Sequence, residues 1–296
     1  MNLFLQLLLN GLVNGCAFAL VALGFALICN TTRIFHFAHG GIYTLSGYIF
    51  YTFYTQHSLP LWLAIPATLI LAACLGILID WIVYRPLDKK NASTMMHMLS
   101  SLGIYIIIVN VICMIYGNNS KILVSGLLPT VKFGNLMLNV VQIATAVTFL
   151  VVFIAFSLSL RFSQLGLKLR AMRDNPTLLA LYGVNANVVR MFVFGAGSAL
   201  CALAGILVGM DVGIDPHVGM TAVVTAAVAM IAGGIGIFEG AAFGALMLGI
   251  LQSIAVWQMS ARWQDMVTFL VLILFLIFRP QGIMGRRGRL EEGVDI

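Results

Sequence analysis

Long apolar runs, separated by short polar connections, divide the chain into nine segments. A hydrocarbon core of about 30 Å is crossed by roughly 20 apolar residues of α-helix. Strands of a membrane barrel would instead alternate apolar and polar residues over about 10 positions, which the run from Val267 to Phe278 does not. The pattern predicts an all-α bundle of transmembrane helices over residues 3–29, 41–56, 59–83, 95–116, 140–160, 190–209, 219–235, 240–257 and 263–278.

The apolar segments fill most of the sequence, so we expect a single transmembrane domain over residues 1–296. Hydrophobic residues make up 61% of the chain and charged residues 9%, whereas about 25% of the residues of a soluble domain are charged. Residues 41–56 and 219–235 are short for a crossing, and 219–235 is either a span or a re-entrant segment. Eight or nine spans are expected, with connections too short to hold a soluble catalytic domain.

The positive charges predict the orientation, because Lys and Arg concentrate in cytoplasmic loops. If the N-terminus lies outside and all nine segments cross, the C-terminus and a basic tail over residues 279–296 lie in the cytoplasm. Only three of the 16 Lys and Arg residues then fall outside, Lys121, Lys132 and Arg262. The net charge of +6 follows from this arrangement and from contact of the tail with anionic headgroups, so nucleic acid is not needed to explain it.

Two connections are longer than the others. The outside stretch over residues 117–139 is either a small cap, facing whatever delivers a solute, or a solvated loop. The inside loop, over about 161–190, contains a predicted short helix. Asn175 can cap this helix, Pro176 suits its first position and Gly183 suits the left-handed residue that ends it.

Apolar side chains of this short helix are expected to be exposed at the cytoplasmic face. A helix of fewer than about 12 residues is unstable alone in water, so the rest of the chain or a partner protein must hold it. The side chains concerned are Leu178, Leu179, Leu181 and Tyr182.

The sequence contains no motif that would supply energy or catalysis. GxxxxGK[ST], HExxH and GxSxG are all absent, so no ATP site, zinc peptidase site or serine nucleophile is indicated. Ion-coupled transporters carry ionisable residues at mid-membrane, whereas Asp80 and Asp211 stand at segment ends. The five cysteines lie in apolar segments without a CxxC pair, which indicates neither zinc nor disulfides. We predict a protein that is not an enzyme and draws energy from another chain.

Small and polar residues within the apolar segments are candidates for a solute passage. Small residues four apart, such as Gly11 and Gly15 or Gly240 and Gly244, let helices approach closely. They serve either packing within one bundle or a glycine-lined passage. The two histidines just after the first segment have no Cys, Asp or Glu nearby to complete a metal site. The polar candidates are Asn10, Asn14, His36 and His39.

Several motifs, taken in order, resemble the hydrophobic permease subunits of branched-chain amino acid ABC importers, the leucine, isoleucine and valine high-affinity uptake type. The resemblance covers nearly the whole chain. It departs from the family pattern at His36 and Gly41, usually Asn and an acid, and at Ile237 and Glu239, usually Ser and Pro. The motifs are Asn10-Gly11-Leu12, Phe37-Ala38-His39-Gly40, Gly166 through Asn185, Gly233-Gly234-Ile235-Gly236 and Arg279-Pro280-Gln281-Gly282-Ile283.

The resemblance implies a multi-pass permease domain of a bacterial inner membrane that forms half of the translocation path for branched-chain or related amino acids. It implies as partners a second homologous permease subunit, two cytoplasmic ABC ATPase subunits, a periplasmic or extracytoplasmic solute-binding protein and membrane lipid. ATP and Mg²⁺ would be bound by the ATPase subunits, and this chain would hold no cofactor or metal.

The resemblance also assigns roles to residues. The short inside helix becomes a coupling helix that an ATPase subunit contacts, through Arg170, Arg173, Asn175, Pro176, Leu178, Leu179, Tyr182 and Gly183. The predicted substrate pathway comprises Asn10, Asn14, His36, His39, Gly233, Gly234 and Gly236.

Two other functions fit the residues at this point. One is a permease for urea or short amides in the same superfamily. The other is a stand-alone channel or facilitator for a small neutral solute, which would move its solute downhill without an ATPase. A secondary transporter ranks third, because no acid stands clearly at mid-membrane.

Overall fold

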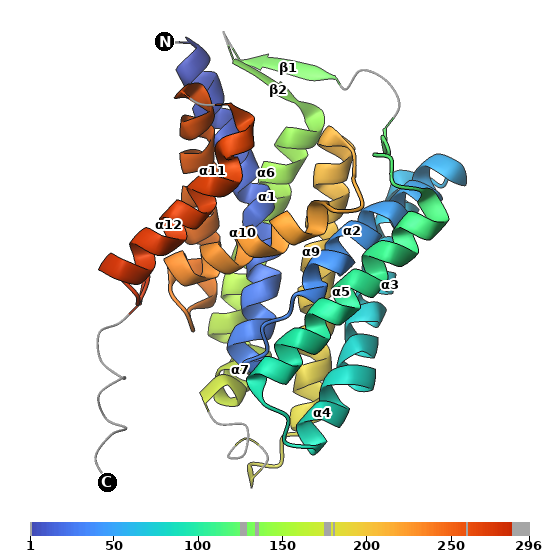
Figure 1. Ribbon diagram of the computed structural model, residues 1–296, viewed down its shortest axis with the longest axis vertical. Coiled ribbons are helices and arrows are strands. Elements are labelled where there is room, and N and C mark those ends of the chain that lie inside the picture. The colour runs from blue at the N-terminus through green and yellow to red at the C-terminus, as the bar shows by residue number, and fades with distance from the viewer. Residues whose placement is uncertain are drawn as a thin grey trace.

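The computed structural model describes residues 2–124, 129–133, 136–174, 179, 181–258 and 260–285. Over these residues the chain is a helical bundle with one short β-hairpin (Figure 1). The N-terminus and the hairpin lie at one end of the bundle, called the hairpin end below. The helices α4 and α7 lie at the opposite end, called the α7 end.

Each of the nine apolar segments forms a helix, as predicted. The elements are α1 (Asn2–Thr32), α2 (Ala38–Tyr51), the π-helical η1 (Thr52–Gln56), α3 (Leu61–Ile79), the π-helical η2 (Asp80–Tyr84), α4 (Arg85–Lys89), α5 (Thr94–Tyr116), β1 (Thr130–Phe133), β2 (Leu136–Asn139), α6 (Val140–Phe162), α7 (Gln164–Asp174), α9 (Ala186–Val212), α10 (Val218–Gly233), α11 (Phe238–Gln258), η3 (Ala261–Trp263) and α12 (Gln264–Phe278).

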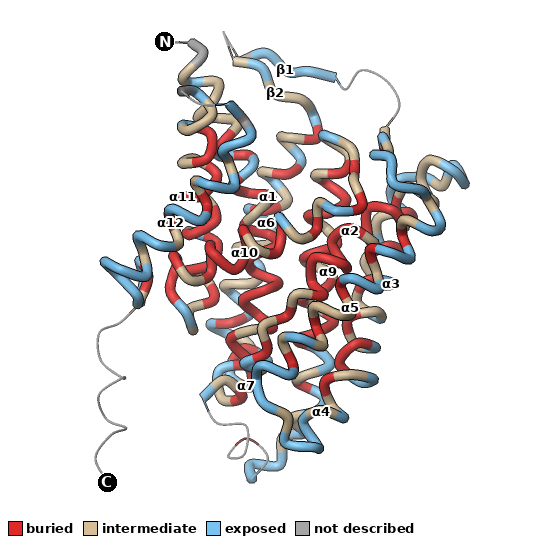
Figure 2. Tube along the Cα trace, in the orientation of Figure 1, coloured by how far each residue is buried: buried red, intermediate tan, exposed pale blue. Residues whose placement is uncertain are grey.

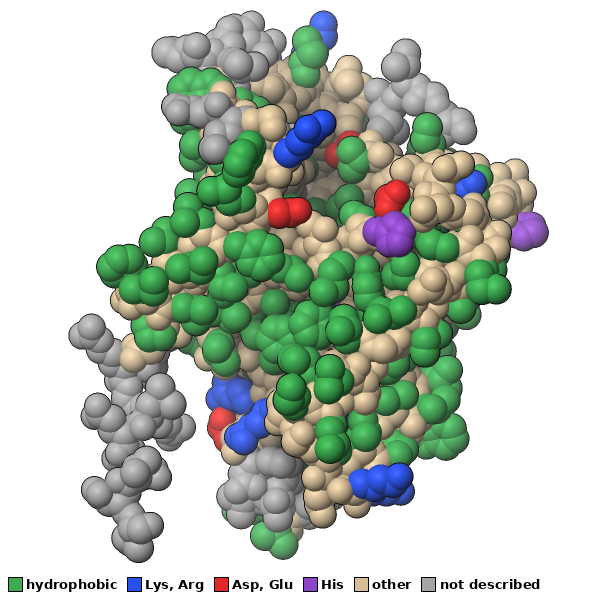
Figure 3. Space-filling view, in the orientation of Figure 1, with side chains coloured by type: hydrophobic (Ala, Val, Ile, Leu, Met, Phe, Trp, Pro, Cys, Tyr) green, Lys and Arg blue, Asp and Glu red, His purple; other side chains and the backbone are tan. Residues whose placement is uncertain are grey.

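Six of the helices in the described part of the chain are long and apolar enough to cross a membrane, and α10 and α12 are shorter apolar helices of 16 and 15 residues. The protein is therefore a polytopic helical membrane protein. On the face drawn in Figure 3, hydrophobic side chains fill the middle and the charged side chains gather toward the two ends. This is the surface expected of a chain whose middle faces lipid.

The helix α1 lies at the centre of the bundle. It packs against α11, α9, α10 and α6, and buried residues concentrate around it (Figure 2). Of its most apolar stretch 78% is buried, against 22% for α5 and 17% for α6. Since the outer helices are just as apolar as α1, their uncovered faces are available to lipid or to another subunit.

Glycines bring α1 and α11 close enough for their backbones to touch, as the small-residue spacing predicts. A Cβ atom built on Gly249 would lie 2.5 Å from the carbonyl oxygen of Gly11 and 2.5 Å from Cα of Gly15. Because both neighbours are backbone atoms of one rigid helix, neither can turn aside. Packing within the bundle thus accounts for these glycines.

We expect Gly249→Ala to lower the free energy of unfolding by about 1–3 kcal/mol, the usual cost of overpacking. Gly103→Ala is the matched control, since nothing lies within 4 Å of a Cβ added to Gly103 in α5. That control should raise helix stability by up to about 1 kcal/mol. Unfolding of both variants by SDS in mixed micelles would measure the difference, and equal midpoints would refute the close contact.

The connection between α5 and α6 contains a two-stranded antiparallel hairpin in which Thr130 pairs with Asn139. Asn139 then starts α6, because its side chain accepts a hydrogen bond from the backbone N–H of Gln142, 2.7 Å away, and the Gln142 side chain accepts from the N–H of Asn139. The Asn139 amide also donates to Asp211 at 2.5 Å. This capping box ties the hairpin to the end of α9.

The last described residues fold back onto α10. The backbone N–H groups of Ile283 and Met284 donate to the carbonyls of Ala232 and Gly233, at 2.8 and 3.1 Å. These carbonyls belong to the last turn of a helix, where no partner within the helix is available. The Arg279-Pro280-Gln281-Gly282-Ile283 motif therefore caps α10.

Candidate functional site

The amphipathic helix α7 begins at a sharp turn after α6. The hydroxyl of Ser163 accepts a hydrogen bond from the N–H of Gly166 at 3.1 Å, and a Cβ on Gly166 would clash with the backbone of Leu160. Leu169 and Met172 of α7 are buried, whereas Arg170 is exposed. Arg170 therefore points away from the bundle at the α7 end.

The residues predicted to contact an ATPase differ in exposure, and the structure describes only some of them. Asn175, Pro176 and Leu178 lie outside the described residues. Tyr182 and Arg170 are exposed, with 86% of Tyr182 accessible, and Gly183 has the left-handed φ of 77° predicted for it.

The prediction that Leu179 is exposed is wrong. Only 5% of Leu179 is accessible, and it belongs to the same buried cluster as Leu169, Met172 and Phe238. A short segment cannot hold its conformation in water by itself. Leu179 supplies the anchoring contact, while Leu181 beside Tyr182 stays exposed at 78%.

Arg173 turns inward to the bundle instead of outward. Its guanidinium donates to the carbonyl oxygen of Gly236 at 2.6 Å and to the carboxylate of Asp174 at 3.0 Å. From the other side, the N–H of Gly236 donates to Oδ1 of Asn30 at 3.1 Å. The loop between α10 and α11 is thus held between the end of α1 and the end of α7.

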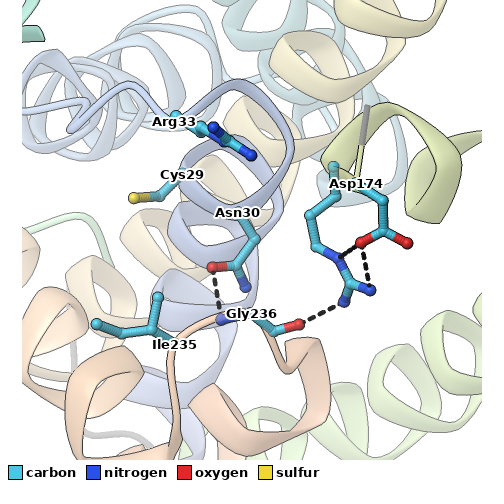
Figure 4. Close-up of a pocket in the computed structure, with 7 residues that line it drawn as sticks. Cys29, Asn30, Arg33, Asp174, Ile235 and Gly236 are labelled. Atoms are coloured by element: carbon cyan, nitrogen blue, oxygen red, sulfur yellow. Dashed lines mark hydrogen bonds and ion pairs between the residues drawn. The ribbon is translucent and has the colours of Figure 1, made fainter. Parts of the chain in front are cut away.

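These residues line an open cavity of about 720 Å³ at the α7 end (Figure 4). We call it the α1–α7 cavity. Asn30 and Arg33 come from the end of α1, and Asp174 stands on the opposite wall. Its lining residues are Cys29, Asn30, Arg33, Arg173, Asp174, Ile235 and Gly236.

The predicted pathway residues do not gather in one place. Asn10 and Asn14 lie toward the hairpin end of α1, where Asn14 is exposed and Asn10 accepts a hydrogen bond from the side chain of Gln6. His36 and His39 follow the other end of α1 and are fully buried. At 1.5 Å per residue, Asn10 is about 33 Å from the end of α1 at Thr32.

The three predicted glycines also differ from one another in surroundings. Gly233 is packed against Gly240 of α11, and Gly234 lies under Gln281 and Gly285. Gly236 has φ of 88° and open space beside it, so it lines the α1–α7 cavity. Of these three glycines, and among the described residues, Gly236 is the one that contacts a predicted ATPase-contact residue, Arg173.

A charged cluster that the sequence does not predict joins η2, α4, α5 and α9 near the α7 end. Asp80 of η2 has no accessible surface, and its two carboxylate oxygens accept from Arg85 at 2.9 Å and from Arg190 at 2.5 Å. Arg190 also pairs with Asp88, which accepts from His97 at 2.8 Å. No signal in a single sequence links Asp80 to Arg190, 110 residues further on.

The buried His36 connects this region to the Phe-Ala-His-Gly motif. Its Nδ1 shares a hydrogen bond of 2.7 Å with the hydroxyl of Tyr84, and the N–H of Ala38 donates to the hydroxyl of Ser101 at 2.9 Å. The start of α2 is thereby fixed between η2 and α5. Within the part of the chain that the structure describes, no three His, Cys, Asp or Glu side chains are grouped to hold a metal ion.

Comparison with known proteins shows a family that the sequence matches. The family described as "Branched-chain amino acid transport system / permease component" matches residues 7–276. The high-affinity branched-chain amino acid transport system permease protein BraD of Pseudomonas aeruginosa is 33% identical, over 96% of both chains. The corresponding permease protein LivH of Escherichia coli K12 is 30% identical, again over 96% of both chains.

A solved structure shares the fold. PsaBC from Streptococcus pneumoniae, in complex with Fab, matches with a TM-score of 0.53 and 12% identity over 94% of this chain and 93% of that chain. At that identity the likeness concerns the arrangement of helices alone.

Proposed function

The chain belongs to the branched-chain amino acid transport permease family, and from this membership we propose that it is the membrane permease subunit of an ATP-driven importer for branched-chain or related amino acids. The observation that carries the proposal is the match over 96% of two permease proteins of branched-chain amino acid transport systems. A match of that extent leaves no large part of the chain for a different activity.

Energy for uphill transport comes, in this proposal, from two cytoplasmic ABC ATPase subunits that bind ATP and Mg²⁺. A second, homologous permease subunit completes the translocation path, and an extracytoplasmic binding protein delivers the solute. The sequence has no P-loop. Asp211, Glu239 and Asp265 stand at helix ends, and Asp80, inside the helical run Leu61–Lys89, is paired with Arg85 and Arg190. These observations support a chain without a motor or ion coupling of its own.

We place the hairpin end outside and the α7 end in the cytoplasm, with eight or nine crossings and both the 161–190 loop and the 279–296 tail inside. An excess of basic residues at the α7 end supports this orientation by the positive-inside rule. Lys121 and Lys132 stand near the hairpin, whereas the α7 end carries Arg85, Lys89, Arg161, Lys168, Arg170, Arg173 and Arg190. A membrane-impermeant maleimide should label Tyr182→Cys in inverted vesicles but not in intact spheroplasts. Labelling of intact spheroplasts would reverse the orientation.

In the proposed path, the exposed Asn14 and half-buried Asn10 meet the solute nearer the outside, and Gly236 meets it at the inner mouth. His36 and His39 have no accessible surface, so their proposed part is to fix the start of α2 beside the path. Gly233 and Gly234 act by letting α10, α11 and the last described residues pack closely.

The test is uptake of radiolabelled leucine, isoleucine and valine into proteoliposomes that hold the chain with its partner subunits and binding protein. Uptake that requires ATP and the binding protein supports the proposal. Leucine movement through the chain alone, without ATPase subunits, would identify a facilitator instead. Urea or acetamide uptake under the same conditions, with none of leucine, would identify the amide permease.

A further inference from the structure

The α1–α7 cavity carries the three kinds of group that recognise a zwitterionic amino acid. Positive donors stand on one wall, where Arg33 is exposed and has no carboxylate within ion-pair distance among the described residues. A carboxylate, Asp174, stands opposite with 57% of its side chain accessible. Apolar surface from Cys29 and Ile235 lies beside them, with Ile235 61% accessible.

Asn30 contributes a donor that the protein leaves without a partner. Its Oδ1 accepts from the N–H of Gly236, and because a backbone N–H can only donate, this bond fixes which end of the amide is which. The other end, Nδ2, is buried and has no hydrogen-bond partner. Asn30 is only 6% accessible, and a buried donor without a partner carries a free-energy cost that a ligand can relieve.

Size and openness also suit a small solute. The cavity volume of about 720 Å³ lies within the range of roughly 300–1,000 Å³ typical of small-molecule sites. Arg173 is already bonded to Gly236 and Asp174, so it holds the wall in place. Arg33 and Asn30 are left to meet an incoming carboxylate, for which a guanidinium is well shaped.

We propose that the α1–α7 cavity is an exit site that binds an aliphatic α-amino acid in its zwitterionic form. Arg33 and Nδ2 of Asn30 bind the α-carboxylate, Asp174 binds the α-ammonium, and Cys29 and Ile235 contact the aliphatic side chain. The choice of an amino acid as ligand rests on the proposed function. The site would hold the solute at the cytoplasmic mouth before release.

Cys29 provides a built-in reporter for this site. The purified full chain in detergent is treated with N-ethylmaleimide, and the alkylation rate of each cysteine is followed by peptide mass spectrometry. L-Leucine should slow alkylation of Cys29 but leave that of Cys74 unchanged, since Cys74 is exposed on α3. Two analogues that each lack one charge, 4-methylpentanoate and 3-methylbutylamine, should need at least tenfold higher concentrations for the same protection.

The variants separate the three contacts. Asn30→Asp keeps an acceptor for Gly236 but replaces the Nδ2 donor by a negative oxygen, and Arg33→Gln removes the cation. Each should raise the leucine concentration for half-protection at least tenfold. Asp174→Asn should weaken protection by leucine without weakening that by 4-methylpentanoate, a pattern that loss of folding cannot produce. The control is Arg262→Gln, on η3 at the hairpin end. In this variant leucine should protect Cys29 at the same concentrations as in the unmodified chain.

Equal protection by leucine and 4-methylpentanoate would overturn the zwitterion site in favour of a plain anion site. No protection by leucine in a chain that still supports ATP-driven leucine uptake with its partners would overturn the exit site while leaving the proposed function intact. Conversely, protection of Cys29 in a chain whose complex transports no amino acid would remove the proposed function and keep the site.

Discussion

Replacing Asp80 with alanine is expected to lower the free energy of unfolding by about 3–5 kcal/mol, the usual cost of removing one partner of a buried ion pair. Asp80 has no accessible surface and faces both Arg85 and Arg190, whose side chains are 20% and 14% accessible. Without the carboxylate, two guanidinium groups would remain near each other in a poorly solvated place. Arg190 also lies 5.7 Å from the centre of the Phe194 ring, so its movement would disturb the start of α9.

The measurement is reversible unfolding by SDS in mixed micelles. Asp88→Ala is the matched control, because it removes a carboxylate from the same cluster at a site that is 40% accessible. Exposed ion pairs contribute about 0–1 kcal/mol, so the control should cost far less than Asp80→Ala. If the two variants unfold alike, the buried pairs around Asp80 do not stabilise the bundle.

A second comparison separates charge balance from packing. Replacing all three charged groups together, as Asp80→Leu with Arg85→Met and Arg190→Met, should recover much of the lost stability, because apolar residues of similar volume often match a buried ion cluster. A triple variant as unstable as Asp80→Ala would mean that the specific hydrogen bonds matter more than the uncompensated charge.

The helices were predictable because a membrane imposes one length and one composition on every crossing. All nine segments became helices, and the spacing of Gly11 and Gly15 correctly indicated a close helix contact. The π-helical turn of η2, which turns both Asp80 and Tyr84 inward, has no comparable signature. In the sequence, the residues of η2 follow those of α3 with nothing to distinguish them from a continued α-helix.

Contacts between distant residues were the part that the sequence could not supply. Asp80 and Arg190 each look like a charge at the end of an apolar segment, and nothing in the spacing pairs them. The burial of the Leu179 side chain could not be predicted either, since Leu181 and Tyr182 beside it are also apolar. Because the run from Leu178 to Tyr182 is apolar throughout, periodicity cannot say which of its side chains is buried.

The burial of Leu179 changes which residues carry the proposed ATPase contact. Leu181 and Tyr182 are 78% and 86% accessible, and neighbouring large apolar side chains so exposed are typical of a binding surface. We expect the double variant Leu181→Asp, Tyr182→Asp to reduce co-purification of the ATPase subunits at least tenfold and ATP-driven uptake in proportion. Burial of one such side chain contributes about 1.5–3 kcal/mol, and 1.4 kcal/mol is a factor of ten in affinity.

Leu179→Asp tests the distinction between contact and anchor. This variant places a carboxylate in the cluster of Leu169, Met172 and Phe238, so it should lower the SDS unfolding midpoint as well as ATPase binding. The double variant at Leu181 and Tyr182 should leave that midpoint unchanged, because its side chains touch little of their own chain. Full ATPase co-purification and uptake by a well-folded double variant would place the contact elsewhere on the α7 end, with the exposed Arg170 as the next residue to change.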